Sequence, residues 1–293
     1  MDAPQLISRN PARPSGSRNP PRPDDASTDR TPECRYLRHV RVIAELMPTG
    51  AAASHASAAM LHRLPVRAPR FDRVHLTRKT SNGGCMGGQI VMHSAEFAPD
   101  EVTIVNGIRV TTPPRTVIDI ARWEGFEQAV IVGDAALHRG LTTADELREH
   151  LRRAEHRPGY RKAAQVISFL DGRSECVGES RSRVAMHRAG LPAPELQAFV
   201  LTEAGEPVGP VDFLFDDLGV IGEFDRKGHS HNGLPQPAAT GHVTDAELRT
   251  MGWSVVRWTW DDLDDPDELP QLLRTAATTA GPRRGSWRAT PRH

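Results

Sequence analysis

Two short apolar segments in the C-terminal half of this chain are each interrupted by a carboxylate. Asp212 lies within residues 209–215 (GPVDFLF), and Glu223 lies within residues 220–226 (VIGEFDR). Acidic side chains seldom sit inside strongly apolar strands without a task, because burying a charge is costly. The intervening DDLG predicts a tight turn, so we expect two antiparallel strands that place Asp212 beside Glu223.

Further charged residues are expected near this pair. Side chains alternate across a strand, so Glu223, Asp225 and Lys227 are predicted to share one face. Lys227 starts about 7 Å further along the strand than Asp225, because a strand advances about 3.3 Å per residue. Glu179 opens a predicted helix over residues 179–188. Helix and strands together can bring these acids to one cleft.

Neighbouring carboxylates repel each other, and a hard divalent cation relieves that repulsion. Oxygen ligands suit Mg²⁺ (or Mn²⁺), so Asp212 and Glu223 are the candidate metal ligands. Such an ion activates water and neutralises charge on a phosphate. Glu179 would orient water or metal, and Lys227 would stabilise the transition state. The alternative is that these acids are surface carboxylates on an edge strand.

The order of predicted elements divides the chain into four parts. Residues 1–33 are rich in proline and arginine and are expected to be disordered, as is the basic tail at residues 281–293. Residues 34–172 are predicted to form an α+β domain. Residues 173–280 read as helix, three-strand meander, helix and strand, which predicts an α/β domain of restriction-endonuclease type.

Within the first domain, local signals predict particular turns and caps. Residues 74–78 and 89–94 are expected to be two strands joined by a glycine-rich hairpin loop. Asn106-Gly107 predicts a second hairpin, because this dipeptide tolerates positive φ at both turn positions. Thr143 and Glu146 have the spacing of a capping box at the start of a helix.

Composition limits the classes of partner and compartment. The chain has 37 basic and 37 acidic residues, so DNA contact would have to come from a local patch. Three cysteines, odd in number and far apart, favour neither a disulfide framework nor a zinc site, and indicate a reducing cytoplasm. We expect no signal peptide and no membrane span. The oligomeric state is left open.

Four strings in the second domain resemble the PD-(D/E)XK nuclease superfamily, particularly the Vsr-like endonuclease branch in actinobacterial proteins. They occupy residues 178–183 (GESRSR), 211–213 (VDF), 222–225 (GEFD) and 252–260 (GWSVVRWTW). The resemblance implies that Glu179 is the helix acid, that Asp212 and Glu223 bind metal, and that Lys227 is the transition-state cation. In the superfamily's E-x-K motif the lysine stands two residues after the glutamate, whereas here that position is Asp225.

The first domain resembles the AbiEi family, antitoxins of type IV toxin-antitoxin systems that act as transcriptional regulators. The matching strings lie at residues 54–65, 74–78, 106–121 and 133–142. This resemblance implies a toxin partner and DNA binding. Those relatives usually begin with a winged-helix DNA reader, and here the proline-rich arm takes its place.

Several residues have both a binding and a structural interpretation. Arg181, Arg183 and Arg188 would hold DNA phosphates beside the acids, or would form a solvated helix face. His229 and His231 would bind a metal or shuttle protons, or would be solvated. His55 and His62 would meet a domain interface, or would form a satisfied, partly buried pair. Trp258 and Trp260 would stack on bases, or would pack in the core.

Two functions from different classes therefore remain. The first is a Mg²⁺-dependent endonuclease acting on DNA phosphodiester bonds. The second is a catalytically degenerate DNA-binding protein or AbiEi-like regulator that retains the nuclease-like fold.

Overall fold

The computed structural model describes residues 31–47, 50–66, 73–81, 83–226 and 244–291. Their elements form mixed α/β structure with two separate sheets, which confirms the predicted mixture of helices and strands. Lys227, His229 and His231 lie outside the described residues. None of the described helices is both long and apolar enough to span a bilayer.

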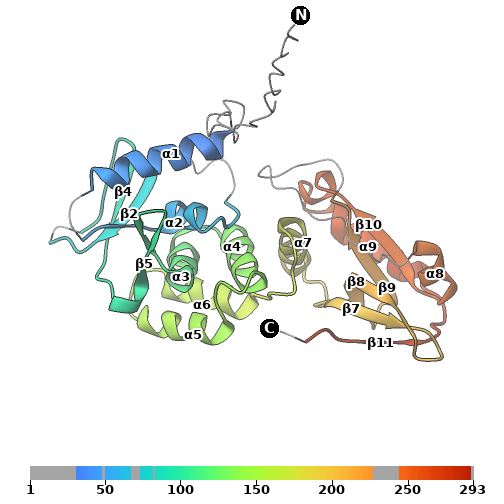
Figure 1. The fold of residues 1–293 in the computed structure, drawn as a ribbon. Helices are drawn as coiled ribbons and strands as arrows, with labels where there is room; N and C mark the ends of the chain where they lie inside the picture. Colours follow the sequence, from blue (N-terminus) through green and yellow to red (C-terminus); the bar gives the residue numbers. More distant parts are fainter. Residues whose placement is uncertain (1–30, 48–49, 67–72, 82, 227–243, 292–293) are drawn as a thin grey trace, which may run out of the picture.

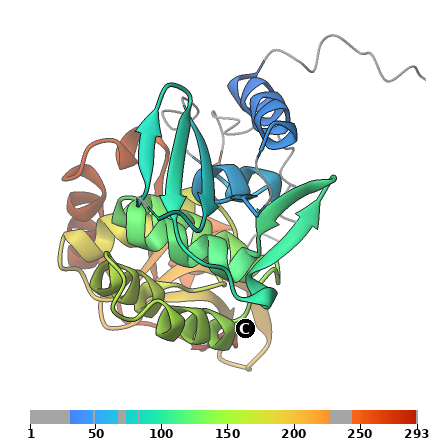
Figure 2. The ribbon, with the colours of Figure 1, turned by 90° about the vertical axis from the view of Figure 1, so that its left-hand side faces the viewer.

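The first unit combines a six-stranded sheet with a group of helices. Its sheet has the order β3-β4-β2-β1-β6-β5. Its strands are β1 (Ala52–Ala53), β2 (Val74–Arg78), β3 (Cys85–Gly87), β4 (Ile90–Ser94), β5 (Val102–Val105) and β6 (Ile108–Thr111). Its helices are α1 (Pro32–Glu45), α2 (His55–Leu61), the 3-10 turn η3 (Pro99–Glu101), α3 (Pro113–Trp123), α4 (Phe126–His138), α5 (Ala144–Arg153) and α6 (Tyr160–Phe169). Figure 2 looks onto this unit, with its cyan-to-teal strands above the green helices.

Local chemistry explains the turns that were predicted here. Asn106 and Gly107 have φ of 51° and 80°, as the hairpin between β5 and β6 requires. The hydroxyl of Thr143 accepts from the Glu146 amide while the Glu146 carboxylate accepts from the Thr143 amide, which confirms the capping box. These signals succeed because the interacting groups lie within a few residues of each other.

The predicted hairpin between residues 74–78 and 89–94 is wrong. β2 and β4 pair in parallel, with Val74 opposite Ile90 and Thr77 opposite His93. The glycine-rich connection contains the extra strand β3, which pairs antiparallel with β4. Parallel strands require a crossover connection, and the loop is long enough to provide one.

The second unit has the order α-β-β-β-α-β. Its elements are α7 (Val177–Arg188), β7 (Glu195–Leu201), β8 (Pro207–Phe215), β9 (Val220–Phe224), α8 (Asp245–Thr250), β10 (Ser254–Trp258), the 3-10 turn η4 (Asp261–Leu263), α9 (Glu268–Thr279) and β11 (Ser286–Arg288). The sheet has the order β10-β9-β8-β7-β11, antiparallel throughout except that β10 runs parallel to β9.

The C-terminal tail differs from its predicted disorder. Residues Ser286–Arg288 form β11, which pairs antiparallel with β7 through Trp287 opposite Val200. The guanidinium of Arg288 also lies 5.1 Å from the Phe199 ring centroid. Ordering the basic tail costs conformational entropy. The pairing of β11 with β7 and the cation–π contact of Arg288 offset that cost.

Both units have their own apolar interior, and α7 contributes to each. Val184 belongs to the core of the first unit, whereas Met186 packs with Phe213 and Trp258 of the second. Trp258 and Trp260 are buried, which confirms their core interpretation over base stacking. In Figure 1, α7 (olive) lies between the two units.

A buried carboxylate attaches α7 to the first unit. Asp134 of α4 is fully buried and accepts from Arg183 Nη1 (2.6 Å), Ser180 Oγ (2.8 Å) and the Asp171 amide (2.8 Å). Burial raises the pKa of Asp134, and the Arg183 charge opposes that rise. The cost of burying each charge is therefore offset only while both Asp134 and Arg183 are present.

We expect Asp134→Ala to destabilise the protein by about 3–5 kcal/mol, because it leaves the Arg183 charge buried without a partner. Urea unfolding followed by tryptophan fluorescence measures the effect. The matched control is Arg148→Ala, which removes the exposed Arg148–Asp145 pair and should cost less than about 1 kcal/mol. Equal losses in the two variants would contradict the proposed role of Asp134.

Candidate functional site

Asp212 of β8 and Glu223 of β9 lie directly opposite each other. Phe213 pairs with Gly222, so the next antiparallel pair along the register is Asp212 and Glu223. The Asp212 amide donates to Glu223 Oε1 at 3.4 Å, and Asp212 Oδ2 accepts from the Phe224 amide at 2.9 Å. Each carboxylate thus contacts the other's strand, as the sequence predicts.

Glu179 joins this pair through Gln197. The side-chain amide of Gln197 donates to Glu179 Oε2 at 3.3 Å and to Asp212 Oδ1 at 3.4 Å. Gln197 has φ of 51° inside β7, a left-handed conformation that is unusual for a residue within a strand. Such backbone strain is common where a side chain must be aimed at a site. The structure therefore brings Glu179 and Asp212 together around one amide, and Glu223 contacts the backbone of Asp212 from the next strand.

Two of the three acids are buried, Asp212 is partly buried, and their charge compensation is incomplete. Glu179 is 2% exposed and Glu223 is 5% exposed. Burial, followed by the charge of Asp212, raises the pKa of Glu179 to about 7 and that of Glu223 to about 8. Burial also raises the pKa of Asp212. The cluster consequently favours a proton or a cation at neutral pH.

Glu179 is held by groups near the start of α7. Its Oε2 accepts from the Glu175 amide at 2.8 Å, and its Oε1 accepts from Cys176 Sγ at 3.1 Å. Burial raises the pKa of Cys176, which keeps this group a thiol that can donate. Arg226 Nη2 donates to Glu179 Oε1 at 2.7 Å and forms an ion pair. These contacts fix the carboxylate at the helix N-terminus, where negative charge is favoured.

A second arginine approaches the cluster from the other edge of β9. Arg257 of β10 lies opposite Glu223 in the parallel register, and its charge lowers the pKa of that acid. Asp245 of α8 accepts from Arg257 Nη2 at 2.7 Å and thereby holds the guanidinium. The site therefore has one arginine beside Glu179 and another beside Glu223.

Two residues of the predicted set are described less fully than the acids. β9 ends at Phe224, so Asp225 follows the strand, and its amide donates to the Trp258 carbonyl at 2.8 Å. The pKa of Arg257 is raised first by its hydrogen bond to Asp245 and also by the charges of Glu223 and Asp225. The position of Asp225 on the strand face beside Glu223 stays a prediction. Lys227 lies outside the described residues, and its role in the transition state stays a prediction.

The three arginines predicted to hold phosphate differ in their surroundings. Arg183 is buried and engaged with Asp134, which makes its guanidinium part of the interior. Arg181 contacts Glu127 and Asp264, and Arg188 contacts Glu127. These contacts match the interpretation of a paired helix face more closely than that of a free basic patch.

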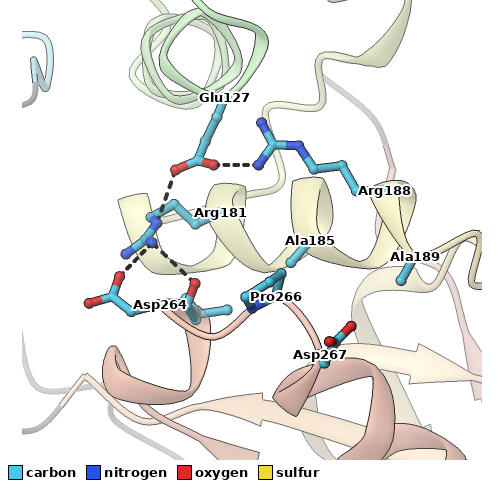
Figure 3. A pocket seen from close by; sticks show the side chains of 9 residues that line it. Glu127, Arg181, Ala185, Arg188, Ala189, Asp264, Pro266 and Asp267 are labelled. Carbon is cyan, nitrogen blue, oxygen red and sulfur yellow. Dashed lines mark hydrogen bonds and ion pairs between the residues drawn. The ribbon is translucent and has the colours of Figure 1, made fainter.

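Figure 3 shows Arg181 and Arg188 in a pocket between α4, α7 and the segment before α9. The pocket has a volume of about 380 Å³. Its charged lining comprises these two arginines and the three acids Glu127, Asp264 and Asp267. Acids therefore outnumber bases, so this pocket is poorly suited to an anionic phosphate.

Sequence reasoning missed Gln197, Arg226 and Arg257. Gln197 does carry a signal, because it is a polar residue between the buried Leu196 and Ala198. Arg226 and Arg257 carried none, since solvent-facing arginines are common beside a strand end. Their positions depend on the pairing of β9 with β10, which no local pattern specifies.

The donor set fits a hard divalent cation. Asp212 and Glu223 present carboxylate oxygens from adjacent strands, and their raised pKa values show that the nearby arginines leave negative charge under-compensated. Glu179 lies across Gln197 from this pair. The arrangement can hold a cation at two carboxylates with a third acid close by.

Comparison with known proteins gives relatives without an assigned activity. No protein-family model matches the chain. Two proteins of Mycobacterium tuberculosis are similar to it, Uncharacterized protein MT2308 of strain CDC 1551 / Oshkosh and Uncharacterized protein Rv2248 of strain ATCC 25618 / H37Rv. Each is 31% identical over 159 residues, which cover 54% of this chain and 58% of the relative. The chain thus spans less than two thirds of the curated relatives it matches, and no solved structure matches it.

The raised pKa of Glu223 predicts a specific pH dependence in metal-free protein. Between its ordinary value of 4.5 and about 8, the unfolded chain loses this proton while the folded chain retains it. Stability therefore falls as pH rises through this window, by at most about 1.4 kcal/mol per pH unit. We expect wild type to lose stability relative to Glu223→Gln as pH rises from 5 to about 8.

Urea unfolding at a series of pH values in the presence of a chelator measures that difference. Glu203→Gln, at an exposed position in the turn after β7, is the matched control and should stay within about 0.5 kcal/mol of wild type throughout. A Glu223→Gln difference that is flat or has the opposite slope contradicts the burial argument.

Proposed function

We propose that this chain is a divalent-metal-dependent nuclease that acts on DNA phosphodiester bonds. The observation that carries the proposal is the contact between Asp212 and Glu223 across adjacent strands, with Glu179 joined to them through Gln197. The α-β-β-β-α-β order with β10 parallel to β9 supports it, because the resembled PD-(D/E)XK nucleases place their acids on such a core.

Asp212 and Glu223 would hold Mg²⁺ or Mn²⁺, since both present carboxylate oxygens to the same side of the sheet. When bound, such an ion supplies a water nucleophile and charge neutralisation for the scissile phosphate. The protein's own contribution is to fix the two ligands by their strand register and backbone hydrogen bonds. Fixed ligands lower the reorganisation needed when the reaction begins.

Glu179 would act as the group that accepts and releases a proton at this site. Its pKa of about 7 allows it to exchange a proton with water near neutral pH. The Cys176 thiol and the Gln197 amide hold its two oxygens in place. Arg226, paired with Glu179, is the described cation nearest to this acid, and Lys227 remains the cation that the family resemblance implies.

A second candidate function is a DNA-binding regulator without cleavage, of the AbiEi-like type and with a toxin as partner. The specific observation in its favour is that Arg226 already compensates Glu179 while Asp225 takes the position of the motif's lysine. An arginine that neutralises Glu179 is compatible with a protein that has retained the nuclease-like fold and lost catalytic activity.

Cleavage of supercoiled plasmid distinguishes the two functions. We expect purified protein to nick the plasmid with Mg²⁺ or Mn²⁺ and not with a chelator. Asp212→Asn should lower the rate by about 100-fold or more, because even outer-sphere changes at metal sites cost 10–100-fold. Asp217→Asn, at an exposed position in the turn before β9, is the matched control and should retain wild-type activity.

Absence of nicking with either ion overturns the nuclease proposal. If salt-sensitive DNA binding persists in wild type and in Asp212→Asn without any cleavage, the regulator is supported instead. Activity that survives Asp212→Asn would indicate a contaminating nuclease and would equally reject the site.

A further inference from the structure

Three histidines converge in the first unit, far from the carboxylates in sequence. His55 begins α2, His75 lies on β2 and His93 lies on β4. β2 and β4 are parallel neighbours with Thr77 opposite His93, so His75 and His93 project from the same face two residues apart. His55 has φ of 50° at the start of its helix, an uncommon conformation that brings its ring to the other two.

The ring nitrogens are close enough to share one ion. His75 Nδ1 and His93 Nε2 are 3.1 Å apart, and one ligand nitrogen from each of the three residues falls within 4.8 Å of the others. In a tetrahedral site with metal–nitrogen bonds of about 2.0–2.1 Å, the nitrogens are separated by about 3.3 Å. His75 and His93 are already near that spacing, and His55 needs a small ring movement. Among the residues that the structure describes, this is the one group of three candidate ligands so closely placed.

Hydrogen bonds outside the trio orient its rings. His55 Nδ1 bonds Ser54 Oγ at 3.0 Å, and Thr77 Oγ1 donates to the same hydroxyl at 2.7 Å. This arrangement leaves Nε2 of His55 to coordinate a metal. The backbone amide of His75 donates to Ser57 Oγ at 2.8 Å, which fixes the main chain at this residue. Metal-binding histidines are usually oriented by a partner on the second ring nitrogen, as Ser54 provides for His55.

The surroundings of the three histidines (His55, His75 and His93, the trio) favour imidazoles without an added proton, which can bind a metal. Burial, followed for His55 by the His75 charge and for His93 by the His55 charge, lowers the pKa of both residues, to about 2 for His93. These imidazoles are therefore neutral at physiological pH, which is the protonation state that coordinates metals. The charge of Asp119 acts on His93 in the opposite direction and would favour a bound cation, whereas the charges of Arg115 and Arg122 lower the pKa of these rings and oppose one.

The site lies close to the surface on the side of His93. His55 and His75 are buried, whereas His93 is only partly so. The indole of Trp123, itself 49% exposed, meets the His93 ring edge-on with centroids 4.8 Å apart. His93 is therefore the ligand nearest to solvent.

We propose that His55, His75 and His93 form a binding site for a divalent transition-metal ion, with Zn²⁺ as the natural occupant. Three imidazole nitrogens suit zinc and its neighbours in the first transition row, and they do not suit Mg²⁺. A three-histidine set leaves the fourth tetrahedral position for water or an added anion. His55 also stacks on His93, with ring centroids 3.6 Å apart. This stacking and the His75–His93 hydrogen bond hold the three rings together, and a shared ion would bind where their nitrogens approach one another.

Metal titration of the full chain tests this proposal. Protein freed of metal with a chelator is titrated with Co²⁺, followed by its visible absorption, and Zn²⁺ is then added in competition. We expect one Co²⁺ per chain with a tetrahedral spectrum that Zn²⁺ displaces, and no effect of excess Mg²⁺. His93→Ala should weaken binding by roughly 100-fold or more, since a direct ligand outweighs an outer-sphere partner.

Matched variants distinguish binding at the trio from binding elsewhere on the chain. His62→Ala removes a histidine at the other end of α2 that bonds the Thr111 carbonyl, and it should leave the Co²⁺ signal unchanged. Asp212→Asn would remove any Co²⁺ held by the carboxylate cluster and should leave the tetrahedral spectrum, which assigns that spectrum to a site other than the carboxylates. Because His93→Ala opens a partly buried space, His93→Gln and circular dichroism of each variant distinguish loss of ligand from loss of fold.

Three results overturn the proposal. The first is no Co²⁺ or Zn²⁺ binding by folded wild type. The second is one-to-one binding that persists in folded His93→Gln, and the third is an equal loss in His62→Ala. Loss confined to His93→Gln and His93→Ala, with the fold intact, supports the three-histidine site.

Discussion

The position of α7 depends on the buried carboxylate of Asp134. This group accepts hydrogen bonds from Ser180 and Arg183 on one side of the helix, and Trp258 Nε1 donates to Ser182 Oγ on another. α7 is thus attached to the first unit by an ion pair and to the second by a buried indole. Because Glu179 is carried by the same helix, the approach of this acid to Asp212 depends on contacts made by both units. The candidate site is consequently sensitive to changes in the first unit that touch none of its residues.

These contacts also explain most of the string GESRSR at residues 178–183. A Cβ on Gly178 would lie 2.0 Å from the Phe224 ring, so glycine is needed where α7 crosses β9. Ser180, Ser182 and Arg183 are occupied by Asp134 and Trp258. Only Glu179 turns its side chain to the carboxylate cluster. The string therefore indicates how the helix packs as much as it indicates chemistry, and a protein that lost catalysis would still need most of it.

What the sequence could predict follows the distance over which each interaction acts. Asp212 and Glu223 were placed together because a short turn and the two-residue period of strands determine their register. The Asn106-Gly107 turn and the Thr143 cap were predictable for the same local reason. The parallel pairing of β2 with β4 and the return of β11 to β7 were not, since partners distant in sequence carry no local signal. Arg226 likewise reaches Glu179 across a separation of 47 residues, through the packing of α7 beside β9.

The two candidate metal sites would select different ions because their donor atoms differ. Neighbouring carboxylates repel each other until a hard cation or a proton arrives, so the affinity of the carboxylate cluster for metal depends on its ionisation. In the histidine trio, burial keeps His55 and His93 neutral, and the trio would bind through nitrogen lone pairs that Mg²⁺ uses poorly. One chain can therefore hold a retained transition-metal ion in its first unit while the second unit exchanges a hard ion with solvent. The first ion would stabilise the packing of α2 on β2 and β4, since it binds the folded arrangement of three separate elements and not the unfolded chain.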